Sequence, residues 1–105
     1  MMRMDGCSSA GIPDFAKAKA WSCIAMKSSS RTFRDKYTGD NNPGRYCQMI
    51  SMVNISDGKM MPCPGGSLIK NSEGKILGAV GVSGASADED EYAGLRGVAD
   101  CGFNL

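Results

Sequence analysis

Histidine is absent from this chain of 105 residues, and its absence limits the chemistry that the other side chains can do. Histidine is the commonest general base and the commonest metal ligand of proteins. Ser83, within Gly81-Val82-Ser83-Gly84, resembles the nucleophile of a strand-to-helix turn, but that motif requires G-x-S-x-G and a partner base. We therefore expect no catalytic residue of the usual kind.

Sulfur and carboxylate groups are the remaining candidates for a metal site. Cys63 could ligate iron as a thiolate, and Met60 or Met61 could do so as a thioether, but their spacing does not distinguish them from core residues. The acidic run at residues 88–91 could attract a hard cation. Capping and the dipole of a following helix explain this run better. The five cysteines contain no C-x-x-C pair, so we expect reduced thiols in a cytoplasmic protein.

A glycine-rich hairpin is the clearest structural signal. Apolar residues 67–70 and 76–82 flank a polar turn at residues 71–74, where Gly74 can take a positive φ. Three glycines weaken the second strand and its end, and they indicate the close approach of another backbone or of a ligand: Gly78, Gly81 and Gly84.

Two helices are expected on either side of the hairpin. The alanine-rich residues 15–26, opened by Pro13, predict the first, with Trp21 and Ile24 widening its apolar face. Residues 87–100 predict the second, which Ser86 caps and Glu89 completes as a capping box. The side chains expected to face inward from this last helix are Tyr92, Leu95, Val98 or Ala99, and Phe103.

Lys19 lies beside the apolar face of the first predicted helix. The simpler interpretation is that its stem packs while its amine reaches water. The functional interpretation is a cation directed at the carboxylate of a ligand.

The middle of the chain is expected to be a loop followed by strands. Residues 31–45 mix charges with turn-forming residues and indicate a solvated loop. The loose alternation of residues 47–55 predicts a strand, which residues 60–70 and 75–83 would extend into three antiparallel strands. Pro62 and Pro64 predict a bulge or a bend before the hairpin.

Size and charge define the class of protein. A chain of this length is one domain, residues 1–105. Its net charge of +1 offers no electrostatic argument for nucleic acid or a membrane as partner. We expect neither a membrane span nor a signal peptide, because no apolar run is long enough and the first residues lack an apolar segment.

Several motifs together resemble a known family. They are Gly65-Gly66, the run from Gly78 to Gly84, the helix start Asp88-Glu89-Asp90, the turn Arg3-Met4-Asp5-Gly6, and Lys19-Ala20 in an alanine-rich helix. This pattern resembles the haem-binding, haem-degrading-domain family that includes the GlcG and HbpS proteins and the C-terminal domain of the corrinoid adenosyltransferase PduO.

The resemblance implies an α+β, profilin-like fold with helices packed on an antiparallel sheet. Because the family's N-terminal helix and first strands are missing here, we expect about three strands and two helices. The resemblance also implies a homo-oligomer that binds haem or a tetrapyrrole-like small molecule without clear catalytic machinery. Any haem iron would need an oxygen, thiolate or thioether ligand, since no histidine is present. The residues expected to shape the ligand pocket or a subunit contact are Arg3, Asp5, Lys19, Gly65, Gly66, Gly81, Ser83 and Gly84.

Two alternatives stay open at this point. One is an oligomeric structural or interaction protein, whose exposed sheet edge would pair with another chain. The other is an accessory protein in small organic acid metabolism, in which Arg3 and Lys19 hold a carboxylate.

Overall fold

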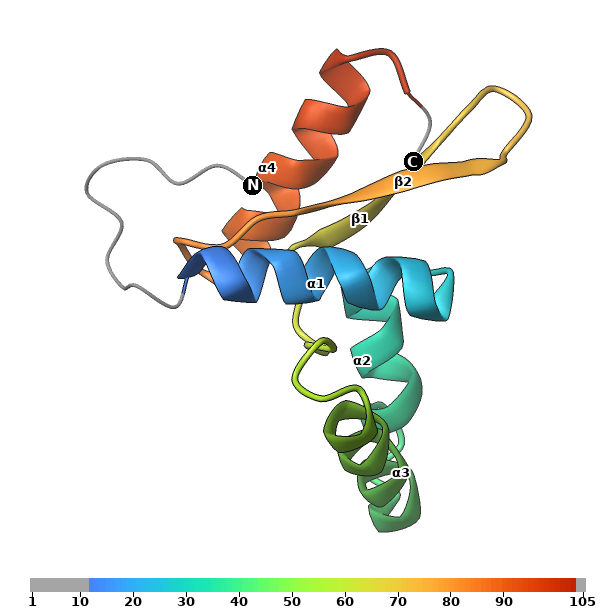
Figure 1. Cartoon of the computed structure of the whole chain (residues 1–105), viewed down its shortest axis with the longest axis vertical. Coiled ribbons are helices and arrows are strands. Elements are labelled where there is room, and N and C mark those ends of the chain that lie inside the picture. Colours follow the sequence, from blue (N-terminus) through green and yellow to red (C-terminus); the bar gives the residue numbers. More distant parts are fainter. Residues whose placement is uncertain (1–11, 104–105) are drawn as a thin grey trace.

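The computed structural model describes residues 12–103 as four helices and a two-stranded sheet. The elements, in chain order, are α1 (Ile12–Met26), α2 (Ser30–Thr38), α3 (Pro43–Ile55), β1 (Gly66–Lys70), β2 (Ile76–Gly81) and α4 (Ala87–Asp100) (Figure 1). The expected α+β class is confirmed, whereas the expected count of three strands and two helices is wrong for the described residues. Arg3 and Asp5 lie outside them.

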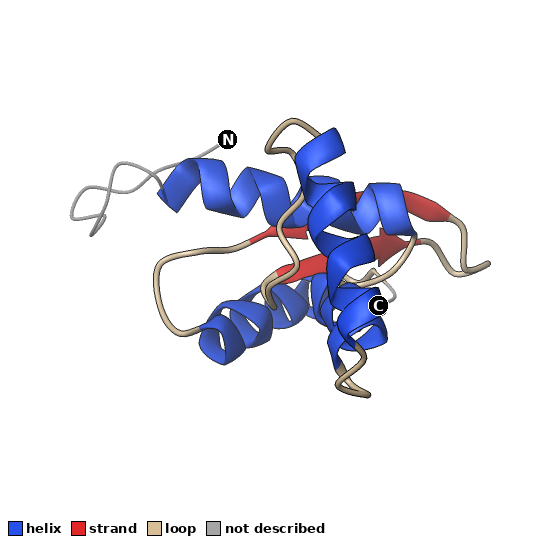
Figure 2. Cartoon of the chain, turned by 90° about the horizontal axis from the view of Figure 1, so that it is seen from below, coloured by secondary structure: helices blue, strands red, loops and turns tan. Residues whose placement is uncertain are grey.

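The hairpin forms the middle layer of the fold. β1 and β2 pair antiparallel, with Gly66 opposite Gly81 and Leu68 opposite Ala79. Side chains alternate between the two faces of a strand, so Gly66, Leu68 and Gly81 face one helix while Val80 faces the other. Figures 1 and 2 show α1 along one face of the strands and α4 along the opposite face.

The hairpin turn follows the sequence prediction. Gly74 has a φ of 83°, and the Asn71 side-chain oxygen accepts hydrogen bonds of 2.9 Å from the N–H groups of Glu73 and Lys75. The strands are shorter than expected, and the strand predicted from residue 60 begins only at Gly66. Prolines at residues 62 and 64 explain this difference, because a proline has no N–H to donate to a ladder.

The loop predicted at residues 31–45 and the strand predicted at 47–55 are both wrong. α2 begins because Ser29 caps it, accepting a 3.2 Å hydrogen bond from the Thr32 N–H. α3 begins because Asn42 accepts a 2.9 Å bond from the Gly44 N–H, with Pro43 in the first turn, where it needs no N–H. The serine run that ends α1 therefore also starts α2, and a loose alternation of apolar residues is compatible with a helix that is exposed on most sides.

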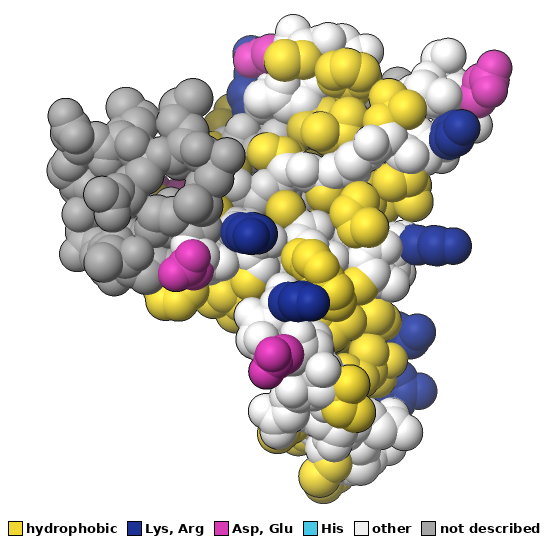
Figure 3. All heavy atoms as spheres, in the orientation of Figure 1, with side chains coloured by type: hydrophobic (Ala, Val, Ile, Leu, Met, Phe, Trp, Pro, Cys, Tyr) yellow, Lys and Arg dark blue, Asp and Glu magenta, His cyan; other side chains and the backbone are white. Residues whose placement is uncertain are grey.

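Helix α3 has no buried residue and packs against α2. The two helices extend away from the hairpin as an arm (Figure 1). Ile50 is 56% exposed and Ile55 is 85% exposed, and Figure 3 shows hydrophobic side chains reaching the surface along this arm as well as over the hairpin and α4.

The faces of the two predicted helices are only partly as expected. In α1 the buried side chains are Lys19, Ser22 and Cys23, whereas Trp21 and Ile24 are exposed. In α4 Val98 is buried and Leu95 half-buried, as expected.

The prediction that Tyr92 and Phe103 face inward is wrong, because their side chains are 68% and 44% exposed. The hydrophobic core of the described residues is small: Cys23, Phe33, Leu68 and Val98.

Helix α1 lies directly on the backbone of the hairpin. A Cβ atom added to Gly81 would stand 1.9 Å from the carbonyl oxygen of Ala16, and one added to Gly66 would stand 2.5 Å from that of Lys19. The expected close approach of another backbone is thus confirmed at Gly81. It does not occur at Gly78 or Gly84, where an added Cβ would meet nothing within 4 Å.

This contact predicts that Gly81→Ala destabilises the protein strongly while Gly78→Ala does not. The first substitution forces α1 away from the hairpin, and we expect it to lower the free energy of unfolding by about 3 kcal/mol. The second adds a methyl group in open space and should change stability by less than about 0.5 kcal/mol. Urea denaturation of both variants measures the difference, and equal effects would show that α1 does not pack as described.

Candidate functional site

A buried ion pair between Lys19 and Asp90 lies where α1, the hairpin and α4 meet. The Lys19 Nζ is 3.3 Å from one carboxylate oxygen of Asp90 and donates a 3.1 Å hydrogen bond to the carbonyl of Val82. The other oxygen of Asp90 accepts a 2.9 Å bond from the Ala85 N–H. Both side chains are nearly inaccessible, with 4% and 5% of their surfaces exposed. One lysine thus joins the middle of α1 to the segment that leads into α4.

The ion pair revises the expectation for Lys19. Its amine does not reach water, so the snorkelling interpretation is wrong. The carboxylate beside it belongs to Asp90 of the same chain. A role for Lys19 toward a ligand stays a prediction, and it would require the ligand to compete with Asp90.

Three of the four predicted glycines lie against Lys19 or the backbone of α1. Gly65 has a φ of 129°, and a Cβ there would stand 2.6 Å from the Val82 carbonyl and 2.9 Å from the Lys19 Nζ. Gly66 and Gly81 contact the backbone of α1. These three positions therefore accommodate α1 and the lysine amine.

Ser83 and Gly84 lie in the segment between β2 and α4. Ser83 is half-buried and Gly84 is exposed. None of the predicted site residues within the described part of the chain lines the cavities described below.

The acidic start of α4 is used for pairing as well as capping. The Ser86 hydroxyl accepts a 3.2 Å bond from the Glu89 N–H, which confirms the predicted cap. Arg31 of α2 donates through its Nε to both oxygens of Glu91, at 3.0 and 2.9 Å, and pairs with Asp88. The hydrogen bonds from these two carboxylates raise the pKa of Arg31. No local sequence pattern predicts this link, because its partners are 57 and 60 residues apart.

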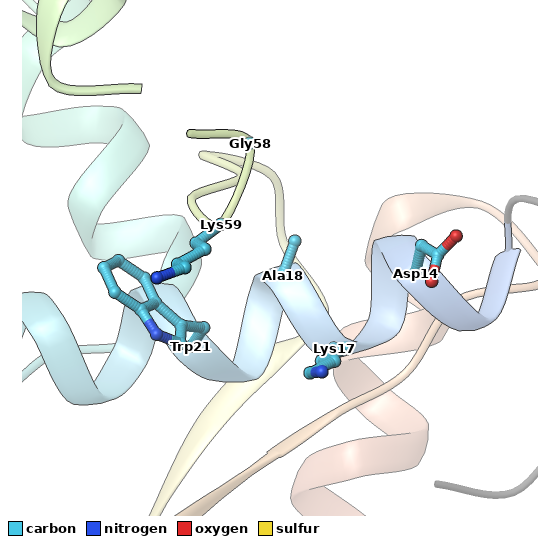
Figure 4. A pocket seen from close by; sticks show the side chains of 6 residues that line it. All are labelled: Asp14, Lys17, Ala18, Trp21, Gly58 and Lys59. Atoms are coloured by element: carbon cyan, nitrogen blue, oxygen red, sulfur yellow. The ribbon is translucent and has the colours of Figure 1, made fainter. Parts of the chain in front are cut away.

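A cavity of about 360 Å³ follows the outer side of α1. The Lys59 amine lies 5.9 Å from the centre of the Trp21 ring, and Figure 4 shows Asp14 farther along the helix and Lys17 pointing away from both. Apart from Lys59, which follows α3, these side chains are spread along α1, and together they carry charges of both signs. They do not converge on a common point, so this surface offers no defined ligand position.

A second cavity is an apolar groove of about 320 Å³ between the hairpin and α4. Among residues 12–103, every lining side chain is apolar or absent: Ile69, Val80, Val82, Ala93, Gly94, Gly97, Val98, Cys101 and Phe103. A Cβ added to Gly97 would meet nothing within 4 Å, so the groove is open above the backbone of α4. We call this surface the apolar groove.

The thiols differ in their ability to ligate a metal. Cys23 is buried beneath Gly66, and burial raises the pKa of its thiol to about 11, so it is protonated at neutral pH. Cys101 is a free, exposed thiol that lines the apolar groove. No cluster of three or more metal-ligating side chains exists within residues 12–103. Among the described residues that line the groove, Cys101 is the one that carries sulfur.

The family of the chain follows from comparison with known proteins. The model of the family described as "Haem degrading protein HbpS-like" matches residues 1–99. The chain belongs to the HbpS-like family. No curated protein matches it in sequence.

Three solved structures share the fold of this HbpS-like chain. They are the PduOC:haem complex (TM-score 0.79, 22% identity, 98% of this chain and 69% of the other), Klebsiella pneumoniae protein ORFY (0.76, 22%, 95% and 63%) and HbpS (0.70, 20%, 96% and 63%). The chain thus spans about two thirds of the length of each. None of the helices in the described part is long and apolar enough to cross a membrane.

The ion pair predicts that Lys19→Met destabilises this HbpS-like chain by about 3–5 kcal/mol, because the substitution leaves the buried Asp90 carboxylate without its cation. Adding Asp90→Asn removes that charge while keeping an oxygen for the Ala85 N–H, so the double variant should recover much of the loss. Lys17→Met, at an exposed position on the same helix, is the control and should change little. Thermal and urea unfolding of the four proteins measure these terms, and a double variant that is no more stable than Lys19→Met contradicts the account.

Proposed function

We propose that this chain is a haem-binding module in which the apolar groove holds the macrocycle. The observation that carries the proposal is the lining of the groove, to which the described part of the chain contributes no charged side chain. Pockets for planar organic cofactors are mostly apolar, with few polar groups. The family description and the haem in the PduOC complex favour haem over other apolar ligands.

The shape of the groove supports a flat ligand. Gly94 and Gly97 place bare helix backbone on one wall, and Val80 and Val82 of the hairpin form the other. Gly94 is buried, and a Cβ there would stand 3.4 Å from the side chain of Val82, so the groove is narrow at that end. The open end lies at Gly97 and Cys101.

Cys101 is the residue that we propose as iron ligand. Thiolate ligation increases electron density on haem iron, and that is the chemistry which the bound group would supply. The protein's own contribution is to exclude water from one face of the macrocycle and to hold the thiol at its rim. The chain provides no histidine for this role.

Gly97→Leu tests the groove as the haem site. The leucine side chain fills open space in the groove and also favours the helix over glycine, so loss of binding cannot be attributed to unfolding of α4. We expect a hemin titration, followed by the Soret band, to show at least about tenfold weaker binding than for the parent chain, the loss of about 1.4 kcal/mol. Gly97→Ala, which adds only a methyl group, is the matched control and should bind nearly as the parent does.

Two further variants test Cys101 as the iron ligand, independently of the groove. Cys101→Ser should shift the Soret maximum of the ferric complex, whereas Cys47→Ser, at an exposed thiol on α3, should leave it unchanged. Absence of saturable binding by the parent chain would reject the function. Unchanged affinity in Gly97→Leu would reject the groove as the site.

A further inference from the structure

A cavity of about 380 Å³ lies beside β1, where the end of α1 meets the start of α2. We call it the edge cavity. It is lined by residues 27–29 and Thr32 on the helical side and by residues 67, 68 and 70 of β1, with Leu95 of α4. Ser30, next to it, donates to and accepts from the backbone of Gly66, which fixes α2 against the strand. Most of its lining residues carry a hydroxyl or an amine, unlike those of the apolar groove.

Ser67 is the feature of the edge cavity that lacks an explanation within the fold. The residue is 2% exposed, and its hydroxyl has no hydrogen-bond partner among the described residues. A buried hydroxyl without a partner destabilises the folded state, because it has lost its hydrogen bonds to water. An acceptor atom of a ligand in the cavity would satisfy it.

Two lysines give the edge cavity a positive charge. Lys27 takes a left-handed backbone conformation, with a φ of 53°, directly after α1, and Lys70 ends β1. Neither has an acidic partner within residues 12–103, whereas Arg31 nearby is held by Asp88 and Glu91. The ammonium groups of both lysines are therefore free to attract an anion.

The start of α2 adds to this positive field. Ser29 caps the helix and Thr32 lies in its first turn, and both residues line the edge cavity. The first N–H groups of a helix and its dipole favour an anion at this end. The buried hydroxyl of Ser67, on a separate element, points to the same kind of ligand.

We propose that the edge cavity binds a small organic acid through its carboxylate. Ser67 donates its hydroxyl to one carboxylate oxygen, and Lys27 and Lys70 neutralise the charge. Leu68 and Leu95 form the apolar part of the lining, against which a short carbon chain packs. This apolar part selects an organic carboxylate over inorganic phosphate, which has no apolar portion.

Titration of the full chain with n-butyrate, followed by backbone amide shifts in NMR spectra, tests the site. We expect saturable shifts at residues 27–32 and 67–70. Ser67→Ala should weaken binding at least about tenfold, since a hydrogen bond to a charged group contributes about 1.5–3 kcal/mol. The same variant should be at least as stable as the parent, because it removes an unpaired hydroxyl. Ser72→Ala, at an exposed serine in the hairpin turn, is the matched control.

Charge and ligand controls complete the test. Lys70→Gln should weaken butyrate binding several-fold, and Lys75→Gln, at an exposed lysine that does not line the cavity, should not. Equal binding of inorganic phosphate or of 1-butanol overturns the carboxylate assignment, and unchanged affinity in Ser67→Ala overturns the site. Gly97→Leu should bind butyrate as the parent does. The proposal for the edge cavity and the proposal for the haem groove can therefore be rejected independently.

Discussion

The contact between the backbone of α1 and the glycines of the hairpin is the constraint on which the other features depend. A side chain at Gly81 or Gly66 would overlap carbonyl groups of α1, so the helix can approach only because these positions lack a Cβ. Close packing of this kind compensates for a small hydrophobic core, in which few large apolar side chains are buried. The glycines that looked like a ligand-contact motif thus accommodate a helix.

The Lys19–Asp90 pair extends this contact to the other face of the sheet. Once α1 lies on the hairpin, Lys19 reaches past Gly65 to the Val82 carbonyl and to Asp90 at the start of α4. Arg31 holds the same end of α4 from α2. With its first turn fixed from two directions, α4 lies along the hairpin and leaves the apolar groove beside Val80. Within the chain, the residues that resemble the family's motif therefore help to position α4, and their role toward a ligand stays a prediction.

The sequence predicted the parts of the fold that have local causes. The hairpin turn follows from the positive φ of Gly74, and the start of α4 follows from the Ser86 cap. α2 and α3 were missed because the caps Ser29 and Asn42 occur in runs of polar residues that also suit a loop. The two ion-pair links could not be predicted, because their partners are 57 to 71 residues apart in the sequence. Both candidate sites combine residues from several elements, which only the fold brings together.

Hydrogen–deuterium exchange with and without hemin distinguishes the two faces of the hairpin. On one face α1 covers the glycines, and on the other we propose that haem binds. We predict that hemin slows exchange at residues 93–101, at the end of α4, and at the end of β2. The amides of α1 and of Gly65 and Gly66 should keep the same exchange rates. Protection confined to α1 and those glycines, with α4 unchanged, would contradict this proposal.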